Sequence, residues 1–242
     1  MGSISFDKDH FGEGASRRAY KAKVTKGTYA GYNKGTELVL KVIKASAYNE
    51  GVRLTNEDIR AQRLTARYAD TFNSTMRPEK PIYVRVGTLH SSEKEHFDSR
   101  GNRTINKGEN MLLEQFIHGH WQKFNSNTGW SCQSCQTPDA FSHWTWVHSN
   151  GQYLVCDLQG HRGRPGGPKW GPTGSRDYYL FTDPVVMSRT GEFGCTDLGS
   201  QGIQDWFARH TCNQYCRSLG VAGNKPRASQ AQRRKRMQTS YR

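Results

Sequence analysis

Short apolar runs separated by polar turns predict several strands in this chain. Residues 37–44, Glu-Leu-Val-Leu-Lys-Val-Ile-Lys, form a run interrupted by Lys41, and residues 111–117 form another. Residues 81–89 also read as a strand. A lysine inside an apolar run must reach water or meet an anion, because an unpaired buried ammonium is costly. Lys41 is therefore a candidate for binding a phosphate.

Two segments carry helical periodicity instead. Thr55-x-x-Asp58 matches a capping box, and the apolar spacing that follows predicts a helix from about residue 56 to 73. Glycines at 194, 199 and 202 precede a second helix, with apolar residues at 203, 206 and 207. Glycines before a helix start suit an anion site, although they equally suit a loop that packs closely.

Asn150-Gly151 lies between two β-prone runs and predicts a hairpin over residues 140–160. Alternation then places Tyr153, Val155, Asp157 and Gln159 on one strand face and His143 on the other. A carboxylate and an amide two residues apart suit a hard cation such as Mg²⁺. The alternative is an ordinary strand end with solvated polar residues.

Glycines also mark the first turn of the chain. Residues 11–15, Phe-Gly-Glu-Gly-Ala, read as a turn between two strands, and Gly12 and Gly14 could place backbone N–H groups over phosphates. A plain hairpin turn is the alternative. Residues 91–110 read as a charged loop without an assigned function, and residues 161–180 as a flexible basic insertion rather than core.

Six cysteines without a secretory signal point to thiolate or metal chemistry before disulfides. His210-x-Cys212-x3-Cys216 can converge on one Zn²⁺ if the preceding helix ends there and a fourth ligand comes from elsewhere. The alternative is buried thiols beside unrelated histidines. Cys132-x-x-Cys135 has no matching second pair, so we interpret it as free surface thiols, with a zinc half-site as the alternative.

Length and charge limit the class of protein. A chain of 242 residues allows one large domain or two lobes, and its net charge, 35 − 21 = +14, favours phosphate-bearing ligands, acidic protein segments or nucleic acid. No apolar run approaches a membrane span, and Met1–His10 lacks a signal-peptide core. We expect an intracellular, cytoplasmic protein without a membrane partner.

Residues 226–242 form a basic tail that is expected to be flexible, and residues 232–242 are expected to be available for docking acidic partners or for self-phosphorylation at Thr239 or Ser240. Deleting residues 232–242 should leave stability nearly unchanged.

Taken together, the motifs resemble the α-kinase family of atypical protein kinases, which includes myosin-heavy-chain kinases, the kinase of elongation factor two and kinase domains fused to cation channels. The resemblance runs from about Phe11 to Leu219. Its most specific matches are Phe11-Gly-Glu-Gly-Ala, Arg17-x-Ala-Tyr, Leu40-Lys41, Asp58-Ile-Arg-Ala-Gln62, Glu114-x-Phe-Ile, Asn125-Ser-Asn127-x-Gly129, Ala140-Phe-Ser-His143, Asp157-Leu-Gln159-Gly160, Thr182-Asp183-Pro184, the late glycines, and His210-x-Cys212-x3-Cys216.

The resemblance implies an α+β, bilobed protein-kinase-like fold, with an N-lobe of about residues 1–113 and a C-lobe of about 114–225 that carries a structural zinc. It implies ATP and Mg²⁺ as ligands, and a protein with a Ser or Thr acceptor, helical or acidic, as substrate. By match, the phosphate-side residues are Gly12, Gly14, Arg17, Lys41 and Gly199. Glu114 marks the adenine-side hinge, and Asn127 belongs to the nucleotide site. Asp157 and Gln159 match the magnesium ligands, Asp183 the carboxylate beside the substrate hydroxyl, and His143, His210, Cys212 and Cys216 the zinc ligands.

Two other functions remain open. A zinc-stabilised nucleic-acid-binding module is supported by the charge and by Trp144 and Trp146, which could stack bases. It does not account for Lys41, Asp157, Gln159 and Asp183 as one set. A kinase fold kept as a scaffold would bind ATP and transfer nothing.

Overall fold

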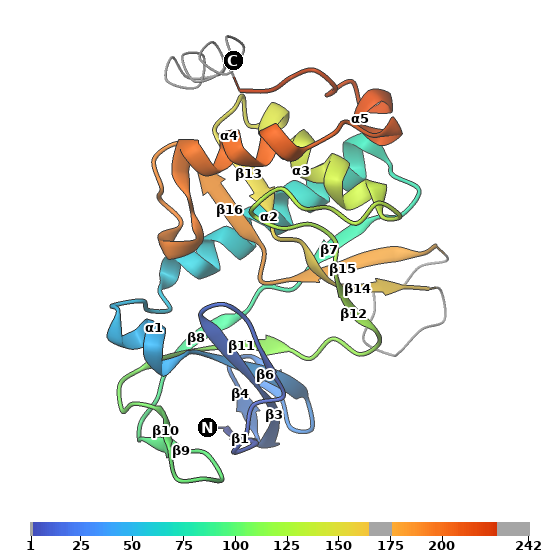
Figure 1. Cartoon of the computed structure of the whole chain (residues 1–242). Coiled ribbons are helices and arrows are strands. Elements are labelled where there is room, and N and C mark those ends of the chain that lie inside the picture. Colours follow the sequence, from blue (N-terminus) through green and yellow to red (C-terminus); the bar gives the residue numbers. More distant parts are fainter. Residues whose placement is uncertain (1, 165–175, 227–242) are drawn as a thin grey trace. The chain divides into compact units, whose positions relative to one another are not determined.

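The computed structural model describes residues 2–164 and 176–226 (Figure 1). The chain forms two compact units. The first contains Met1–Gln122, Gln159–Pro184 and Phe193–Cys195, and the second contains Lys123–Leu158, Val185–Glu192 and Thr196–Arg242. The strand at the expected lobe boundary, residue 113, runs on through Glu114 to Gln115, and this part of the first unit ends at Gln122. The division into an N-lobe and a C-lobe stays a prediction. Of the expected tail, residues 227–242, with Thr239 and Ser240, lie outside the described residues.

The elements of the first unit, with two that cross its boundary, are β1 (Ser3–Phe6), β2 (Gly12–Glu13), β3 (Arg17–Lys26), β4 (Thr28–Tyr29), β5 (Tyr32–Asn33), β6 (Glu37–Ile43), α1 (Ala45–Asn49), α2 (Asn56–Met76), β7 (Ile82–Val84), β8 (Thr88–Ser91), β9 (His96–Phe97), β10 (Arg103–Ile105), β11 (Asn110–Gln115), β12 (Trp121–Lys123), β14 (Gln159–Gly163), β15 (Tyr178–Thr182) and η1 (Gly194–Thr196). The second unit contains α3 (Gln136–His148), β13 (Tyr153–Cys156), β16 (Val185–Ser188), α4 (Gly199–Arg209) and α5 (Gln214–Ser218). None of the helices within 2–164 and 176–226 has both the length and the apolar character needed to cross a membrane.

The main sheet of the first unit has the strand order β1-β3-β6-β11-β8, with β2 paired to β3. The predicted strands over 37–44 and 111–117 are β6 and β11, which confirms both. Alternation along β6 buries Leu38, Leu40 and Val42 in a cluster with Tyr20 and other apolar residues. Lys41 therefore faces the opposite side of the sheet, directly across from Ala19 and Leu112.

The capping box predicted at Thr55 is present, and α2 extends to Met76, three residues beyond the expected end. Oδ2 of Asp58 accepts a hydrogen bond from the Thr55 N–H at 2.7 Å. Ile59, Gln62, Ala69 and Phe72 are buried. The periodicity in the sequence therefore identified the buried face of α2.

The predicted hairpin over residues 140–160 is wrong in its first arm, which lies in α3. All residues from Thr137 to Trp146 are buried, so burial overrides the β propensity of the Trp and Thr side chains. Asn150 (φ 52°) and Gly151 (φ 72°) end this helix with left-handed backbone, and the Gly151 N–H donates to Trp146 O at 2.8 Å.

The second arm forms a strand only over β13, which pairs with the distant β16. Asp157 has φ 55° and leaves the extended conformation, and Gln159 starts a different strand, β14. The expectation that Tyr153, Val155, Asp157 and Gln159 share one strand face is therefore wrong.

Three other sequence interpretations need correction. Residues 81–89 contain two strands in different sheets, since β7 pairs with β15 and β8 pairs with β11. Residues 161–180 begin and end in β14 and β15, where Tyr178, Tyr179 and Leu180 are buried core. The expected insertion can therefore span only residues 164–177, between β14 and β15. Residues 165–175 lie outside the described residues. The loop expected over 91–110 contains the short β9–β10 pair.

Gly160 is required by the close pairing of β14 with β15. Its φ is 145°, and a Cβ there would lie 2.1 Å from the carbonyl oxygen of Leu180. We expect Gly160→Ala to destabilise the chain by about 2 kcal/mol or more, which is roughly 4 to 8 °C in Tm. Gly14→Ala is the matched control, because a Cβ at Gly14 meets no described atom within 4 Å. Equal thermal unfolding of both variants would contradict this explanation of Gly160.

Candidate active site

Arg17, Lys41 and Glu114 lie on one face of the main sheet, opposite the apolar cluster of Leu38, Leu40 and Val42. Cross-strand register places Arg17 opposite Ile43, and Glu114 opposite Val39, so all three share the face of Lys41. Lys41 Nζ lies 2.6 Å from Glu114 Oε2, and both side chains are largely buried. The lysine inside an apolar strand thus meets a carboxylate of the neighbouring strand. The adenine-side role of Glu114 stays a prediction.

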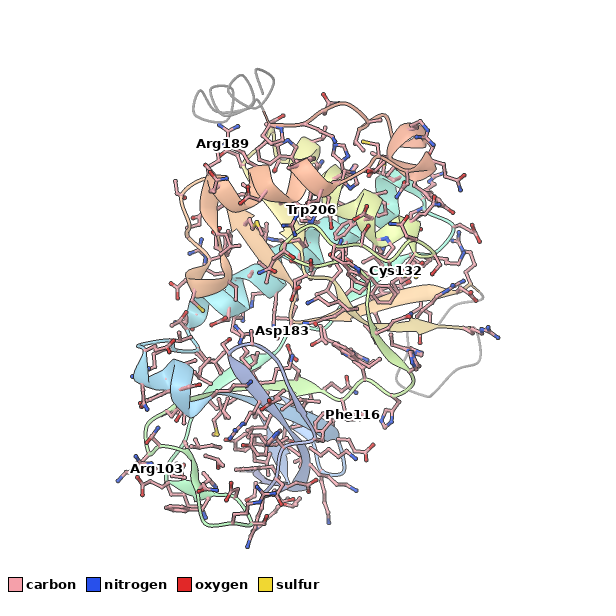
Figure 2. All side chains as sticks on the ribbon, in the orientation of Figure 1. Arg103, Phe116, Cys132, Asp183, Arg189 and Trp206 are labelled. Carbon is pink, nitrogen blue, oxygen red and sulfur yellow. The ribbon has the colours of Figure 1, made fainter. Side chains whose placement is uncertain are left out.

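Asp183 directly follows β15, with φ 53°, and is labelled in Figure 2. Its Oδ1 accepts a hydrogen bond from Arg17 Nη1, and its Oδ2 lies 3.4 Å from Lys41 Nζ. Burial raises the pKa of Asp183, but the charges of Arg17 and Lys41 outweigh burial and lower it to about 2. Burial lowers the pKa values of Arg17 and Lys41, but the neighbouring carboxylates outweigh burial and raise both pKa values. All three groups are therefore ionised at neutral pH.

Each cation also has a carboxylate partner of its own. Arg17 Nη2 lies 2.5 Å from Asp58 Oδ1, while the other oxygen of Asp58 caps α2. Glu114, the partner of Lys41, accepts hydrogen bonds from Gln62 Nε2 at 2.7 Å and Thr182 Oγ1 at 2.6 Å. Gln62 and Thr182 were not predicted as site residues. A buried glutamine on the core face of α2 was the available signal, because a buried amide needs partners.

The glycine turn and Gln159 belong to the same unit. The Gly14 N–H donates to Arg17 O at 2.9 Å, so residues 14–17 close the β2–β3 hairpin and confirm a turn between strands. A Cβ on Gly12 or Gly14 would meet no described atom within 4 Å. Space therefore exists beside this turn, and its phosphate role stays a prediction. Gln159 Nε2 donates to Asp183 O at 3.5 Å.

Asp157, Asn127 and Gly199 belong to the second unit. Asp157 Oδ1 lies 2.7 Å from Lys123 Nζ. Asn125 Oδ1 accepts a hydrogen bond from the Leu158 N–H at 3.0 Å, and Asn127 lies half-buried in the following turn. Gly199 begins α4 with φ 64°, a conformation that favours glycine. The shared use of Asp157 and Gln159 by one Mg²⁺, and the nucleotide roles of Asn127 and Gly199, stay predictions.

A separate cluster in the second unit brings together His143, His210, Cys212 and Cys216, whose ligand atoms all lie within 4.8 Å of one another. His143 comes from α3 rather than from the predicted strand, His210 follows α4, and Cys216 lies in α5. His143 Nδ1 lies 3.2 Å from His210 Nε2 and 3.7 Å from Cys212 Sγ, and Cys216 Sγ lies 3.6 Å from His210 Nε2. Tetrahedral zinc with N and S ligands requires separations of about 3.3 to 3.8 Å. The donor set therefore fits zinc.

The surroundings of the cluster also suit a metal. His143 Nε2 lies 2.8 Å from Asn224 O, and His210 Nδ1 lies 2.9 Å from Asp139 Oδ2, so the outer nitrogens have partners and the inner ones face the sulfurs. Burial lowers the pKa of His143 to about 4 and raises that of Cys216 to about 12. A dication would stabilise the Cys216 thiolate that burial disfavours.

Two further sequence interpretations concern cysteine and tryptophan side chains of the second unit. Cys135 is buried, so the expectation of two surface thiols is wrong for this residue. Trp144 and Trp146 are buried in the second unit, against His148 and Phe207 respectively. They are therefore unavailable to stack on bases, which removes one argument for a nucleic-acid-binding module.

Comparison with known proteins identifies the class. A family model described as the Alpha-kinase family matches residues 12–216. The chain therefore belongs to the Alpha-kinase family, as its motifs predicted. It is 31% identical over 231 residues to alpha-protein kinase vwkA of Dictyostelium discoideum, covering 90% of this chain and 31% of that protein. It is 30% identical over 226 residues to eukaryotic elongation factor 2 kinase of Homo sapiens, covering 90% of this chain and 27% of that protein.

Among solved structures, the chain is similar to the alpha-kinase domain of myosin-II heavy chain kinase A in complex with AMP-PNP, with a TM-score of 0.72 and 25% identity. The alignment covers 90% of this chain and 87% of that domain. The α+β kinase-like fold is thereby confirmed. The chain spans about a third or less of the full-length relatives that it matches.

We expect one tightly held zinc per purified chain, because four protein ligands close the coordination shell. Cys216→Ala should remove the metal and the soluble fold together, and a strong chelator or acid should do the same to the parent chain. Cys195→Ala is the control, since Cys195 is an exposed thiol outside the cluster. Elemental analysis and thermal unfolding provide the readouts. Absence of stoichiometric zinc, or an unchanged Tm for Cys216→Ala, would refute a structural zinc site.

Proposed function

We propose that this chain is the catalytic domain of an ATP-dependent protein kinase that transfers the γ-phosphate of Mg-ATP to Ser or Thr of a protein. The observation that carries the proposal is the buried cluster in which Asp183 lies between Arg17 and Lys41. Phosphoryl transfer depends mainly on cations that hold the phosphates and on an aligned hydroxyl. A chain of the Alpha-kinase family in which Arg17 and Lys41 share one sheet face and both contact Asp183 has the cations and the carboxylate that this chemistry needs.

Lys41 and Arg17 bind the phosphates in this proposal. Glu114 and Asp58 hold the two cations in place, so either cation can share its charge with a phosphate and stay paired. The β2–β3 turn, where Gly12 and Gly14 leave open space, borders the phosphates, and Glu114, Asn127 and Gly199 complete the nucleotide site. The family member whose structure contains AMP-PNP supports nucleotide as the ligand.

Asp157 and Gln159 are the residues that would hold magnesium. Their carboxylate and amide oxygens are hard donors of the kind that Mg²⁺ prefers. Bound magnesium supplies charge neutralisation at the phosphate oxygens. His143, His210, Cys212 and Cys216 would hold a structural zinc that ties α3, the end of α4 and α5 together.

Asp183 orients the substrate hydroxyl. A carboxylate with a pKa of about 2 is a weak base, so hydrogen bonding to the hydroxyl is favoured over early proton removal. A loose phosphoryl-transfer transition state requires little prior deprotonation of the nucleophile. The substrate is a protein with a Ser or Thr acceptor, in a helical or acidic segment, and the net charge of +14 favours an acidic one.

Two other functions remain as alternatives. A kinase-fold scaffold would bind nucleotide and transfer nothing. Only the net charge favours a zinc-stabilised nucleic-acid-binding module, because Trp144 and Trp146 are buried. Incubation with γ-labelled ATP and an acidic or helical protein distinguishes a kinase from both alternatives, because label transfer occurs only with a kinase.

We expect Asp157→Ala and Lys41→Ala each to lower phosphoryl transfer by about a hundredfold or more while the chain stays folded, because a metal ligand or a phosphate partner is lost. Lys23→Ala is the matched control, since Lys23 is an exposed lysine on β3. Transfer from radiolabelled ATP and circular dichroism are the measurements. Normal turnover by either site variant would rule out its assigned role.

For Asp183→Asn, we expect kcat to fall by about a hundredfold or more, with a much smaller change in ATP affinity, because the acceptor hydroxyl loses its partner. Asp205→Asn is the control, since Asp205 is an exposed carboxylate bonded to Gln201. Steady-state kinetics and nucleotide titration give the two quantities. If ATP affinity falls and the rate at saturation is intact, Asp183 has only a structural role in its turn.

A further inference from the structure

Cys132 and Cys135 close a tight turn immediately before α3. The Cys135 N–H donates to Cys132 O at 3.0 Å, and the Cys132 N–H donates to Phe124 O at 2.8 Å. A hydrogen-bonded turn of four residues brings its end Cα atoms within about 7 Å. Disulfides span Cα separations of about 4.4 to 6.8 Å. The backbone therefore already places the two cysteines at a distance that a disulfide can bridge.

The sulfur atoms of Cys132 and Cys135 both contact the hydroxyl of Ser134. Ser134 Oγ lies 3.3 Å from Cys132 Sγ and 3.8 Å from Cys135 Sγ. Burial raises the pKa of Cys132, but hydrogen bonds from the side chains of Ser134 and Cys135 and from their backbone N–H groups outweigh burial and lower it. The Cys135 thiol is thus a direct neighbour of the Cys132 sulfur.

The exposure of the pair is uneven. Cys132 is partly exposed, whereas Cys135 is only 4% exposed. A partly exposed thiol with a lowered pKa reacts first with an oxidant, and its buried neighbour resolves the product. The remaining thiols of the second unit differ, since burial raises the pKa of Cys156 well above its usual range, and Cys212 and Cys216 belong to the metal cluster.

We propose that Cys132 and Cys135 form a reversible thiol–disulfide pair whose reaction partner is a low-molecular-weight disulfide such as oxidised glutathione. The Cys132 thiolate attacks one sulfur of the oxidant, so that a mixed disulfide forms and one glutathione thiolate leaves. The Cys135 thiolate then attacks the Cys132 sulfur and expels the second glutathione. Two protein thiols are oxidised, one disulfide is reduced to two thiols, and both protons pass to the solvent or the leaving thiolates.

The loop that carries this pair is bonded to two other parts of the second unit. Asn125 Nδ2 donates to Ser142 Oγ of α3 at 2.9 Å, and Asn125 Oδ1 accepts from the Leu158 N–H beside Asp157. A disulfide would fix the turn between this loop and the first residue of α3. The pair is therefore a modification site in the loop that also carries Asn125, the residue that binds the Leu158 N–H. Thiol–disulfide exchange at this pair does not require phosphoryl transfer.

The full chain, purified with reduced thiols, is equilibrated in glutathione buffers of increasing oxidised fraction and then alkylated under denaturing conditions. Trypsin releases Phe124–Arg162 as one peptide with Cys132, Cys135 and Cys156, because no Lys or Arg lies between its ends. We expect this peptide to lose two alkylation sites and the mass of two hydrogen atoms, with only Cys156 alkylated. Dithiothreitol should restore all three alkylation sites.

Variants trap the intermediate and provide controls. Cys135→Ser should keep one glutathione on Cys132, and Cys132→Ser should prevent the loss of two hydrogen atoms. Cys195→Ser should leave the reaction unchanged. Oxidation should also leave the zinc content of the parent chain unaltered. Three alkylated cysteines at every buffer composition would overturn the proposal. A second zinc per chain that is lost in Cys132→Ser would also overturn it, because Cys132 and Cys135 would then be metal ligands.

Discussion

The placement of Asp183 between Arg17 and Lys41 is the interaction on which the candidate site depends. Removing one partner from a buried ion pair costs about 3 to 5 kcal/mol, because the other charge is left uncompensated. In this cluster each cation keeps its own carboxylate, Asp58 for Arg17 and Glu114 for Lys41. Asp183 is the shared member. A phosphate can therefore compete for both cations without leaving either of them unpaired.

The sheet and α2 position this cluster through ordinary packing. Alternation along β6 sends Leu38, Leu40 and Val42 into the apolar core and leaves Lys41 on the other face. Gln62, buried on α2, bonds both to Glu114 and to the Gly87 N–H, at 2.7 Å each. A glycine at 87 is needed because a Cβ would lie 2.7 Å from Leu113 O. The orientation of Glu114 thus depends on packing that involves no ligand.

The sequence predicted the parts of the site that follow from local periodicity or from a short motif. Lys41 was identifiable from the sequence as a cation in an apolar strand, and Asp58 as a capping residue. The structure adds that the second oxygen of Asp58 contacts Arg17. The structure brings together the four residues predicted as zinc ligands, although zinc binding stays a prediction and His143 was placed on a strand. Its helix, α3, is buried on all sides and has no polar face, so its pattern cannot be distinguished from that of a buried strand. The partner of β13 is β16, some thirty residues along the chain, and local sequence does not specify such pairing.

A crystal structure of the chain with Mg²⁺ and a non-hydrolysable ATP analogue tests the central role of this cluster most directly. We expect Lys41 and Arg17 to contact the phosphates while Lys41 remains paired with Glu114 and Arg17 with Asp58, and Asp157 and Gln159 to contact the metal. A nucleotide bound away from Lys41, or phosphates held without either cation, would contradict the proposed site.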